Sequence, residues 1–415
     1  MRRRWPLTPR GSGALVLAIA CFALAGELGT VELLYVGCLL LAVLLIGMIA
    51  LRLGSRLDRA VRSLHPNVVP VGQSAHVRID TTLRAAMPVT AARWSDRLPA
   101  AVTGESKGAL DLAAARTGAG RESVVRYEAT AQRRGIHSLG PFAVQISDPF
   151  GLTRRSHTGG EPTRLIAVPA TIPLPAIPLS VSESGGVQQS ASDRLGQGTD
   201  NLIARPYAPG DSMRRIHWRA TAHRDQLMVR QEEQDSTPAA TVLIDLSARR
   251  WDAAARSAPG EAEAFEAALS ACVSIVLRLA HDGCVVHVCD SDGRPLCEPV
   301  PGADAAAEIE AMLVRFATLT TRRDDTLTGV ASLFTGDTTG PVAVITGYLD
   351  DADAVALAPA AHHSTLPVLL SAHPQAGALD RARDAGWHTA AIGPDTDLAE
   401  VWTGLADHGN RHVVA

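Results

Sequence analysis

Lysine is almost absent from this chain of 415 residues. Lys107 is the single lysine, so nearly all of the positive charge is carried by arginine. The formal net charge is −4, which excludes a polycation. The arginines nevertheless gather in two places, at the N-terminus and in the middle of the chain, and each cluster needs its own explanation.

Cysteine is scarce, and its positions exclude a disulfide framework. The six cysteines are unevenly spaced and form no C-x-x-C pair, which suits a reducing compartment. Cys284, His287 and Cys289 come close together in the sequence. On a strand, however, Cys284 faces away from the other two, because side chains alternate. Buried free cysteines are therefore favoured over a metal cluster.

Several motifs that mark catalytic sites are also missing. The sequence contains no G-x-x-x-x-G-K-[ST] phosphate loop, no Rossmann glycine fingerprint and no H-E-x-x-H motif. Acidic residues and histidines are plentiful, but no motif places them. This lack argues against an enzyme.

Two apolar stretches near the N-terminus predict a membrane hairpin within residues 1–62. Leu33 to Leu51 has 19 residues without a charge, close to the roughly 20 that a helix needs to cross a bilayer. Gly13 to Leu28 is broken only by Glu27. Arginines flank both stretches, whereas the connection from Gly26 to Glu32 has none. We therefore predict two helices in the cell membrane, with both ends and all soluble domains in the cytoplasm.

A cleaved signal peptide is an alternative interpretation of the first stretch. Its arginine-rich start, short apolar core and Ala23-Leu24-Ala25 fit such a peptide. The second stretch would still span the membrane. Both interpretations place the rest of the chain in the cytoplasm.

Residues 63–169 alternate short runs of apolar and polar residues with glycine-containing turns. We expect strands over Ala75–Asp80, Val124–Ala131 and Phe142–Ile146. Short strands at this spacing predict a β-sandwich, which would act as a rigid spacer or an interaction module. Residues 170–197 are rich in Pro, Ser, Gly and Gln and predict an extended linker.

Residues 237–415 alternate predicted strands and helices. We expect strands at Ala240–Leu246, Cys284–Cys289, Pro341–Thr346, Leu366–Leu370 and Thr389–Ile392. We expect helices at Glu261–His281, Ala305–Phe316, Ala378–Ala385 and Asp397–Leu405. This alternation predicts an α/β domain with a mostly parallel sheet and helices on both faces. Ligands of such sheets bind at the carboxyl ends of the strands, where Asp245 would lie.

Residues 198–236 join the two halves and hold the second arginine cluster. Pro209-Gly210-Asp211 is typical of a turn followed by a helix start. A stripe of Met213, Ile216 and Ala220 predicts a short helix. We expect Ile216 and Trp218 to pack against the neighbouring sheet, and three arginines to face solvent: Arg215, Arg219 and Arg224.

The same segment carries a family resemblance. Its spacing of Arg205, Tyr207, Gly210, Asp211, Arg214, Ile216, Trp218 and Ala222 resembles the signature of the domain-of-unknown-function 58 (DUF58) family. The resemblance implies a membrane-tethered protein with a von Willebrand factor A-like domain, often encoded beside a MoxR-type AAA+ ATPase. The candidate binding residues are Arg205, Tyr207, Gly210, Asp211, Arg214, Arg215, Ile216, Trp218, Arg219 and Arg224.

The resemblance also raises the question of a metal site. Von Willebrand A domains often hold Mg²⁺ through an Asp-x-Ser-x-Ser motif at the end of the first strand. Asp245 and Ser247 match that motif, but Arg249 replaces the second serine, and Gly347 stands where a later acid is expected. An arginine beside the ion would oppose its charge. We therefore predict a degenerate site with weak or no Mg²⁺ binding, and no other cofactor.

Three functions remain as hypotheses. The first is a non-enzymatic membrane scaffold or adaptor whose A-type domain binds a protein partner, such as a MoxR-type ATPase, in the assembly or maturation of envelope-linked complexes. The second is binding of anionic lipid or nucleic acid by the central arginines. Nucleic acid is disfavoured because Ile216 and Trp218 have the spacing of a packed helix. The third is a metal-dependent hydrolase centred on Asp245.

Overall fold

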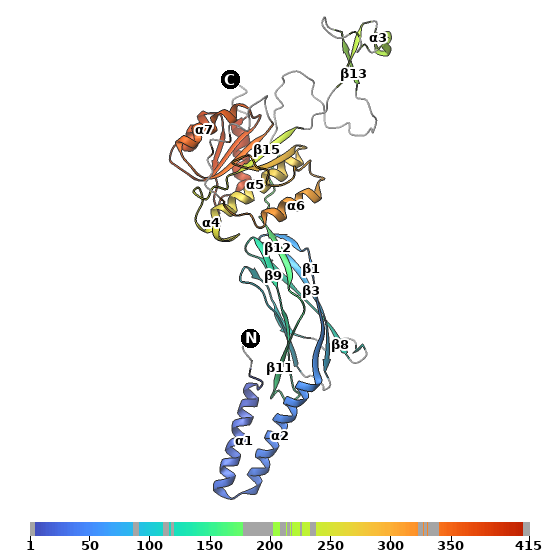
Figure 1. Ribbon diagram of the computed structural model, residues 1–415, viewed down its shortest axis with the longest axis vertical. Helices are drawn as coiled ribbons and strands as arrows, with labels where there is room; N and C mark the ends of the chain where they lie inside the picture. Colours follow the sequence, from blue (N-terminus) through green and yellow to red (C-terminus); the bar gives the residue numbers. More distant parts are fainter. Residues whose placement is uncertain are drawn as a thin grey trace.

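The computed structural model of the chain describes residues 5–85, 91–110, 116–117, 120–176, 202–207, 213, 216, 218–224, 226–232, 238–322, 327, 330 and 340–409. A pair of helices, a body of antiparallel sheets and an α/β domain follow one another along its long axis (Figure 1).

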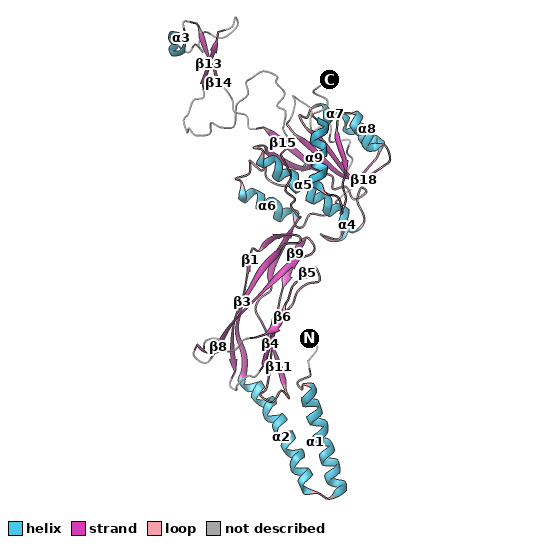
Figure 2. Cartoon of the chain, turned by 180° about the vertical axis from the view of Figure 1, so that it is seen from behind, coloured by secondary structure: helices cyan, strands magenta, loops and turns pink. Residues whose placement is uncertain are grey.

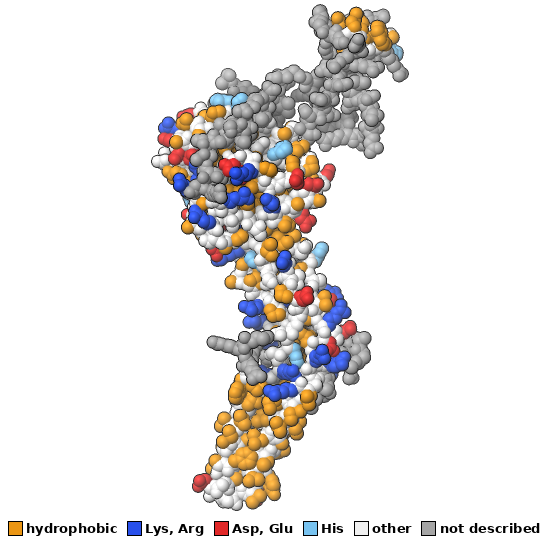
Figure 3. All heavy atoms as spheres, viewed as in Figure 1, with side chains coloured by type: hydrophobic (Ala, Val, Ile, Leu, Met, Phe, Trp, Pro, Cys, Tyr) orange, Lys and Arg blue, Asp and Glu red, His pale blue; other side chains and the backbone are white. Residues whose placement is uncertain are grey.

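The helix pair confirms the two predicted apolar helices. The helices α1 (Pro9–Leu28) and α2 (Val31–Gly54) have 20 and 24 residues, and most of their apolar side chains face outward. Figure 3 shows this pair as a nearly continuous apolar surface. Both helices are long and apolar enough to span a membrane, which marks a membrane protein. Which side the soluble domains occupy stays a prediction.

A third helix, α5 (Glu263–His281), is also long and apolar enough to span a membrane. Of its most apolar window, 72% is buried inside the α/β domain, against 17% for α1 and for α2. Protein therefore covers the apolar surface of α5, whereas the surfaces of α1 and α2 are left for lipid.

The antiparallel body begins at residue 55, eight residues before the boundary expected from the sequence. Strand β1 (Ser55–His65) follows α2 without a break. The expected basic flank of the membrane helix is thus part of a sheet, and Arg62 turns inward. Its guanidinium lies 2.6 Å from the Asp96 carboxylate, which also accepts a 2.6 Å hydrogen bond from Tyr127. The side chains of Arg62 and Asp96 are 2% and 0% exposed.

Two antiparallel sheets enclose one apolar core in this body. The first has the order β1-β3-β8-β5 with β7 beside β8, and the second has the order β11-β10-β4-β6. A third sheet, β2-β12-β9, extends toward the α/β domain (Figure 1). The bounds are β2 Val68–Pro70, β3 Ser74–Ala85, β4 Ala91–Asp96, β5 Val102–Thr103, β6 Lys107–Ala109, β7 Arg116–Thr117, β8 Gly120–Ala131, β9 Gly135–Leu139, β10 Phe142–Ser147, β11 Arg154–Gly159 and β12 Thr163–Val168. The three strands predicted here are confirmed.

The α/β domain holds a sheet of order β16-β15-β17-β18-β19. All four strand pairings in it are parallel. The bounds are β15 Ala239–Ile244, α4 Ala254–Ser257, β16 Val285–Asp290, α6 Ala306–Phe316, β17 Val342–Leu349, α7 Asp351–His362, β18 Pro367–Pro374, α8 Ala378–Asp384, β19 His388–Ala391 and α9 Leu398–Gly409. One apolar core joins the sheet to α5, α6 and α9, and another joins it to α7 and α8. Helices therefore cover both faces, as predicted (Figure 2).

A buried arginine connects the two soluble bodies. Arg134, in the β8–β9 connection, forms a pair of hydrogen bonds of 2.7 and 2.8 Å with the Glu266 carboxylate on α5. It also donates to the carbonyl oxygens of Phe316 and Leu319. The Arg134 side chain is fully buried, so this contact fixes the end of the antiparallel body against the α/β domain.

The segment expected to be a linker begins with residues packed on the same domain. Ser270 donates a 2.7 Å hydrogen bond to the Ala170 carbonyl, and the Ile172 amide donates to Ser274. Trp402 of α9 donates to the Pro175 carbonyl. Residues 170–176 therefore belong to the α/β domain, and 177–200 lie outside the described residues.

Candidate functional site

The Asp245 carboxylate lies at the carboxyl edge of the parallel sheet, directly after β15. Its Oδ1 accepts a 2.8 Å hydrogen bond from the Ser247 amide, and its Oδ2 accepts one of 2.8 Å from the Thr346 hydroxyl on β17. The Asp245 side chain is 1% exposed. Parallel pairing of β15 with β17 brings the two residues together, because both strands end at this edge.

A guanidinium group lies beside the Asp245 carboxylate. The Nε atom of Arg250 lies 3.1 Å from Asp245 Oδ2, and its Nη1 and Nη2 atoms donate to both Asp353 oxygens at 2.5 and 2.8 Å. Nη1 also donates to the Tyr348 carbonyl. We expected the opposing cation at Arg249, whereas the structure turns the next arginine into the site. One arginine thus bridges two carboxylates from different loops.

The path of the loop that carries Arg250 explains why residue 347 is a glycine. A Cβ atom at position 347 would lie 1.9 Å from the Arg250 carbonyl oxygen. That oxygen accepts a 2.8 Å hydrogen bond from the Tyr348 amide. No side chain fits at 347 while the loop carrying Arg250 lies here, so the acid expected at this position is excluded by space.

The acid that completes the site is Asp353, which was not among the predicted site residues. Asp350 caps helix α7 by accepting from the Asp353 amide, and the Asp353 carboxylate accepts in return from the Asp350 amide. This reciprocal capping box presents Asp353 toward Arg250. The D-x-x-D pattern of residues 350–353 was the available signal in the sequence.

Burial and nearby charge together determine the direction in which the pKa values of Asp353 and Arg250 are shifted. Burial raises the pKa of Asp353, but hydrogen bonds and charge from Arg250 outweigh it and bring that pKa below 3.8. Burial likewise lowers the pKa of Arg250, but the hydrogen bond with Asp353 and the charges of Asp245 and Asp353 raise it above its ordinary value. Both groups are therefore charged at neutral pH and neutralise each other.

The oxygen atoms of this edge fit a metal ion poorly while Arg250 is present. Oxygen ligands suit Mg²⁺, but Asp245 Oδ2 already faces the guanidinium and the Thr346 hydroxyl. Among the described residues, no group of three or more His, Cys, Asp or Glu side chains is arranged to hold a metal. The Ser247 hydroxyl, which stands where the metal motif has a ligand, is buried without a hydrogen-bond partner.

The signature segment forms a small unit of its own. Strands β13 (Leu202–Pro206) and β14 (Met228–Glu232) pair antiparallel, and α3 (Trp218–Arg224) contacts β14 through a 3.0 Å hydrogen bond from the Met228 amide to Thr221. Both views show this unit standing apart from the α/β sheet (Figures 1 and 2).

Two expectations for this segment are wrong. Ile216 is buried, but it forms a β-bridge with Val229 and precedes the helix, so the predicted helical stripe does not exist. Trp218 is 69% exposed and Met213 is 68% exposed. The physical reason is that Ile216 pairs with Val229 of β14, whereas the described residues leave Trp218 exposed.

The remaining candidate residues are placed only in part. Tyr207 is half-buried and its amide donates to the Leu227 carbonyl, while Arg224 is exposed. Arg205 lies on β13 and Arg219 on α3. Gly210, Asp211, Arg214 and Arg215 lie outside the described residues.

A short stretch of the antiparallel body matches the pattern of a catalytic serine motif. Residues 104–108 read Gly-Glu-Ser-Lys-Gly, which matches G-x-S-x-G by letters. They connect the short strands β5 and β6, whereas a nucleophile elbow connects a strand to a helix.

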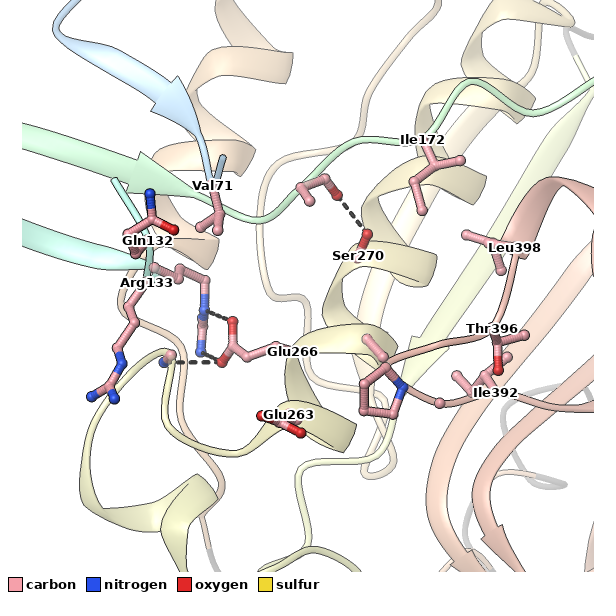
Figure 4. A pocket seen from close by; sticks show the side chains of 16 residues that line it. Val71, Gln132, Arg133, Ile172, Glu263, Glu266, Ser270, Ile392, Thr396 and Leu398 are labelled. Carbon is pink, nitrogen blue, oxygen red and sulfur yellow. Dashed lines mark hydrogen bonds and ion pairs between the residues drawn. The ribbon is translucent and has the colours of Figure 1, made fainter. Parts of the chain in front are cut away.

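A cavity of about 490 Å³ also opens beside the joint of the two soluble bodies (Figure 4). There Glu266 is engaged by Arg134 and by the Gly260 amide.

The comparison with protein families identifies the segment. The family described as "Protein of unknown function DUF58" matches residues 203–371. This match spans the signature segment and the sheet through β18, including Asp245, Arg250 and Asp353. Residues 203–371 therefore match the DUF58 family, and the resemblance seen in the sequence is confirmed. No curated protein matches the chain.

Two solved structures that are similar to this chain each cover less than a third of it. A non-cellulosomal cohesin from Archaeoglobus fulgidus is 12% identical, with a TM-score of 0.18, covering 28% of this chain and 91% of the cohesin. A CARDB domain from Pyrococcus furiosus, solved with di-metal ions, is 11% identical with a TM-score of 0.16, covering 26% and 94%. These scores are too low to support an argument about function.

Proposed function

We propose that the protein is a non-enzymatic scaffold anchored in the membrane, which binds a protein partner through its DUF58 region. The family resemblance suggests a MoxR-type AAA+ ATPase as that partner and the maturation of envelope-linked complexes as the process. It also suggests that the α/β domain is von Willebrand A-like. Apolar helices for anchoring, an antiparallel body as spacer and a distal α/β domain support this division of tasks.

The exposure of Trp218 carries the proposal. Trp218 is 69% exposed and Met213, in the same segment, is 68% exposed, and large apolar side chains are costly to leave in water. Tryptophan is also enriched among the residues that dominate the energy of protein interfaces. Arg224, on the same short helix, is exposed and supplies charge for orienting a partner.

The Asp245 site supports a role without catalysis. Arg250 neutralises Asp245 and Asp353 at the position where a von Willebrand A domain would hold its ion. A hydrolase centred on Asp245 would need this guanidinium to leave. We propose that the bridge instead fixes the β15 and β17 loops as a rigid surface for the partner.

The proposal is tested by affinity capture of the full chain from detergent-solubilised membranes, followed by mass spectrometry. A MoxR-type ATPase should co-purify with the wild-type protein and be lost with Trp218→Ala. Val355→Ala, which truncates another exposed apolar residue on α7, is the matched control and should retain it. Retention of the ATPase by Trp218→Ala, or its absence from the wild-type sample, would contradict the proposal.

Binding of an anionic ligand by the central arginines is a second candidate. Nucleic acid was disfavoured because Trp218 was expected to be packed, and its exposure removes that reason. An exposed tryptophan beside arginine is a combination that stacks on nucleic-acid bases. RNA that co-purifies with the wild-type chain and is lost with Trp218→Ala would favour this candidate over the scaffold.

A further inference from the structure

Both ends of the membrane helix pair are attached to one turn of the antiparallel body. The chain before α1 pairs with the β10–β11 turn: the Thr8 hydroxyl donates a 2.6 Å hydrogen bond to the Gly151 carbonyl, and the Thr8 amide donates to Leu152. A Cβ atom at Gly11 would lie 1.9 Å from the Leu152 carbonyl oxygen. The helices are therefore seated closely on the body, and the geometry of their junction is fixed.

The end of α2 is held by an arginine from the other side of this turn. Arg155, on β11, donates to the carbonyl oxygens of Leu51 and Arg52 in the last turn of α2. Carbonyl groups at a helix C-terminus lack partners within the helix, and a cation there is favoured by the helix dipole. Arg155 thus has a structural role at the point where α2 becomes β1.

A cavity of about 470 Å³ opens at this junction. Arg52, Arg154 and Arg155, here called the junction arginines, line it together with Trp5 and Met48. Met48, which is half-buried, and Leu51, which is buried, supply an apolar wall from α2. The cavity therefore has a positively charged wall and an apolar wall that continues into the membrane helix.

The junction arginines differ from Arg62 in their ion pairing. Among the described residues, no carboxylate is paired with any of the three junction arginines, whereas Arg62, farther along β1, is paired with Asp96. A buried acid of the adjoining turn, Asp148, accepts hydrogen bonds from the Leu152 amide and the Thr153 hydroxyl. Burial, and after it the charge of Arg155, lowers the pKa of His157, so this neighbouring imidazole is neutral at pH 7.

The position of the cavity indicates which anion it would bind. It lies at the end of α2, because Met48, Leu51 and Arg52 line it. Figure 3 shows that the apolar surface of the helix pair gives way to basic side chains at the start of the antiparallel body. This boundary is the depth of lipid headgroups, and Trp5, which is 62% exposed beside it, is a residue type enriched at that depth. Arginine forks match the oxygen atoms of a phosphate, and the apolar surface of α2 matches an acyl chain.

We propose that this cavity is a binding site for an anionic phospholipid. The headgroup phosphate lies against Arg52 and Arg154, and an acyl chain lies along Met48 and α2. Basic pockets at the membrane ends of helices are known physical sites for such headgroups. The site is separate from the DUF58 region and does not depend on the proposed partner.

The proposal is tested on the full chain in neutral detergent micelles, titrated with short-chain phosphatidylglycerol and followed by native mass spectrometry. The double variant Arg52→Gln, Arg154→Gln should weaken binding roughly tenfold or more. Arg155 is left intact because it holds the end of α2. The matched control is Arg56→Gln, Arg59→Gln, which removes the same charge from exposed positions on β1 just beyond the cavity and should weaken binding far less.

Two further arms separate the lipid from other anions. Phosphatidylcholine and inorganic phosphate should neither bind at comparable concentrations nor displace phosphatidylglycerol. Equal weakening in the two double variants, or displacement by inorganic phosphate, would overturn the proposal. If the double variant melts at a lower temperature than the wild type, Arg52→Gln alone, which alters an exposed side chain, is measured against Arg56→Gln and decides the question.

Discussion

The two arginine sites of this structure differ in what faces the guanidinium groups. Arg250 is 13% exposed and lies between two carboxylates, so its charge is used within the fold. The junction arginines face a cavity, and among the described residues no carboxylate pairs with them. An arginine that is buried and paired stabilises a local structure, whereas a group of arginines facing a cavity is available to a ligand.

The largest effect is expected from breaking the buried bridge. Arg250→Met should lower the free energy of unfolding by about 3–5 kcal/mol, because Asp245 and Asp353 are left buried and unpaired. Urea unfolding of the full chain, followed by fluorescence of the buried tryptophans, measures the loss. Arg381→Met is the matched control: its pair with Asp351 is 3.1 Å long but about half exposed, so it should cost less than about 1 kcal/mol. Equal losses would show that the bridge has no special role.

Acid should weaken the same bridge. Because the pKa of Asp353 in the folded protein lies below 3.8, the unfolded state takes up its proton at higher pH than the folded state. The stabilisation is therefore complete well above pH 3.8 and is lost as the pH falls below it. One such group changes the stability by at most about 1.4 kcal/mol per pH unit. Between pH 5 and pH 3, the free energy of unfolding should fall less per pH unit for Asp353→Asn than for the wild-type protein. The same dependence on pH in both proteins would contradict a lowered pKa of Asp353 in the folded state.

The smallest effect on folding is expected at the junction. Arg52→Gln with Arg154→Gln should change the stability in detergent by less than about 1 kcal/mol, since neither side chain is in a described ion pair. Thermal unfolding without added anionic lipid measures this change. A loss as large as that of Arg250→Met would mean that the junction arginines support the fold instead of a ligand.

The sequence predicted the helices and strands in which apolar residues recur with a regular period. It missed elements such as β1, in which a charged residue is buried. The five strands and four of the helices of the α/β domain were predicted because their apolar residues recur with a clear period, as in α5, whereas α4 and α7 were not predicted. Strand β1 was missed because its arginines resemble the basic flank of a membrane helix. Only the position of Asp96 on a distant strand shows that Arg62 is a buried residue.

The candidate site shows the same limit. Asp245, Ser247 and the carboxyl edge of β15 were predicted from a motif. Sequence spacing could not tell which of the adjacent residues Arg249 and Arg250 turns toward Asp245, because a tight turn after β15 decides it. Trp218 was misplaced for a related reason: helical spacing was assumed, whereas pairing of Ile216 with Val229 determines the local structure.

The central claim is that Arg250 takes the place that a metal ion would occupy beside Asp245. Calorimetric titration of the full chain with Mg²⁺ tests it most directly, with Asp245→Ala titrated in parallel. The account predicts no binding heat for the wild-type protein up to millimolar Mg²⁺ and no difference between the two proteins. Micromolar binding by the wild-type protein that Asp245→Ala abolishes would contradict the account and restore the metal site.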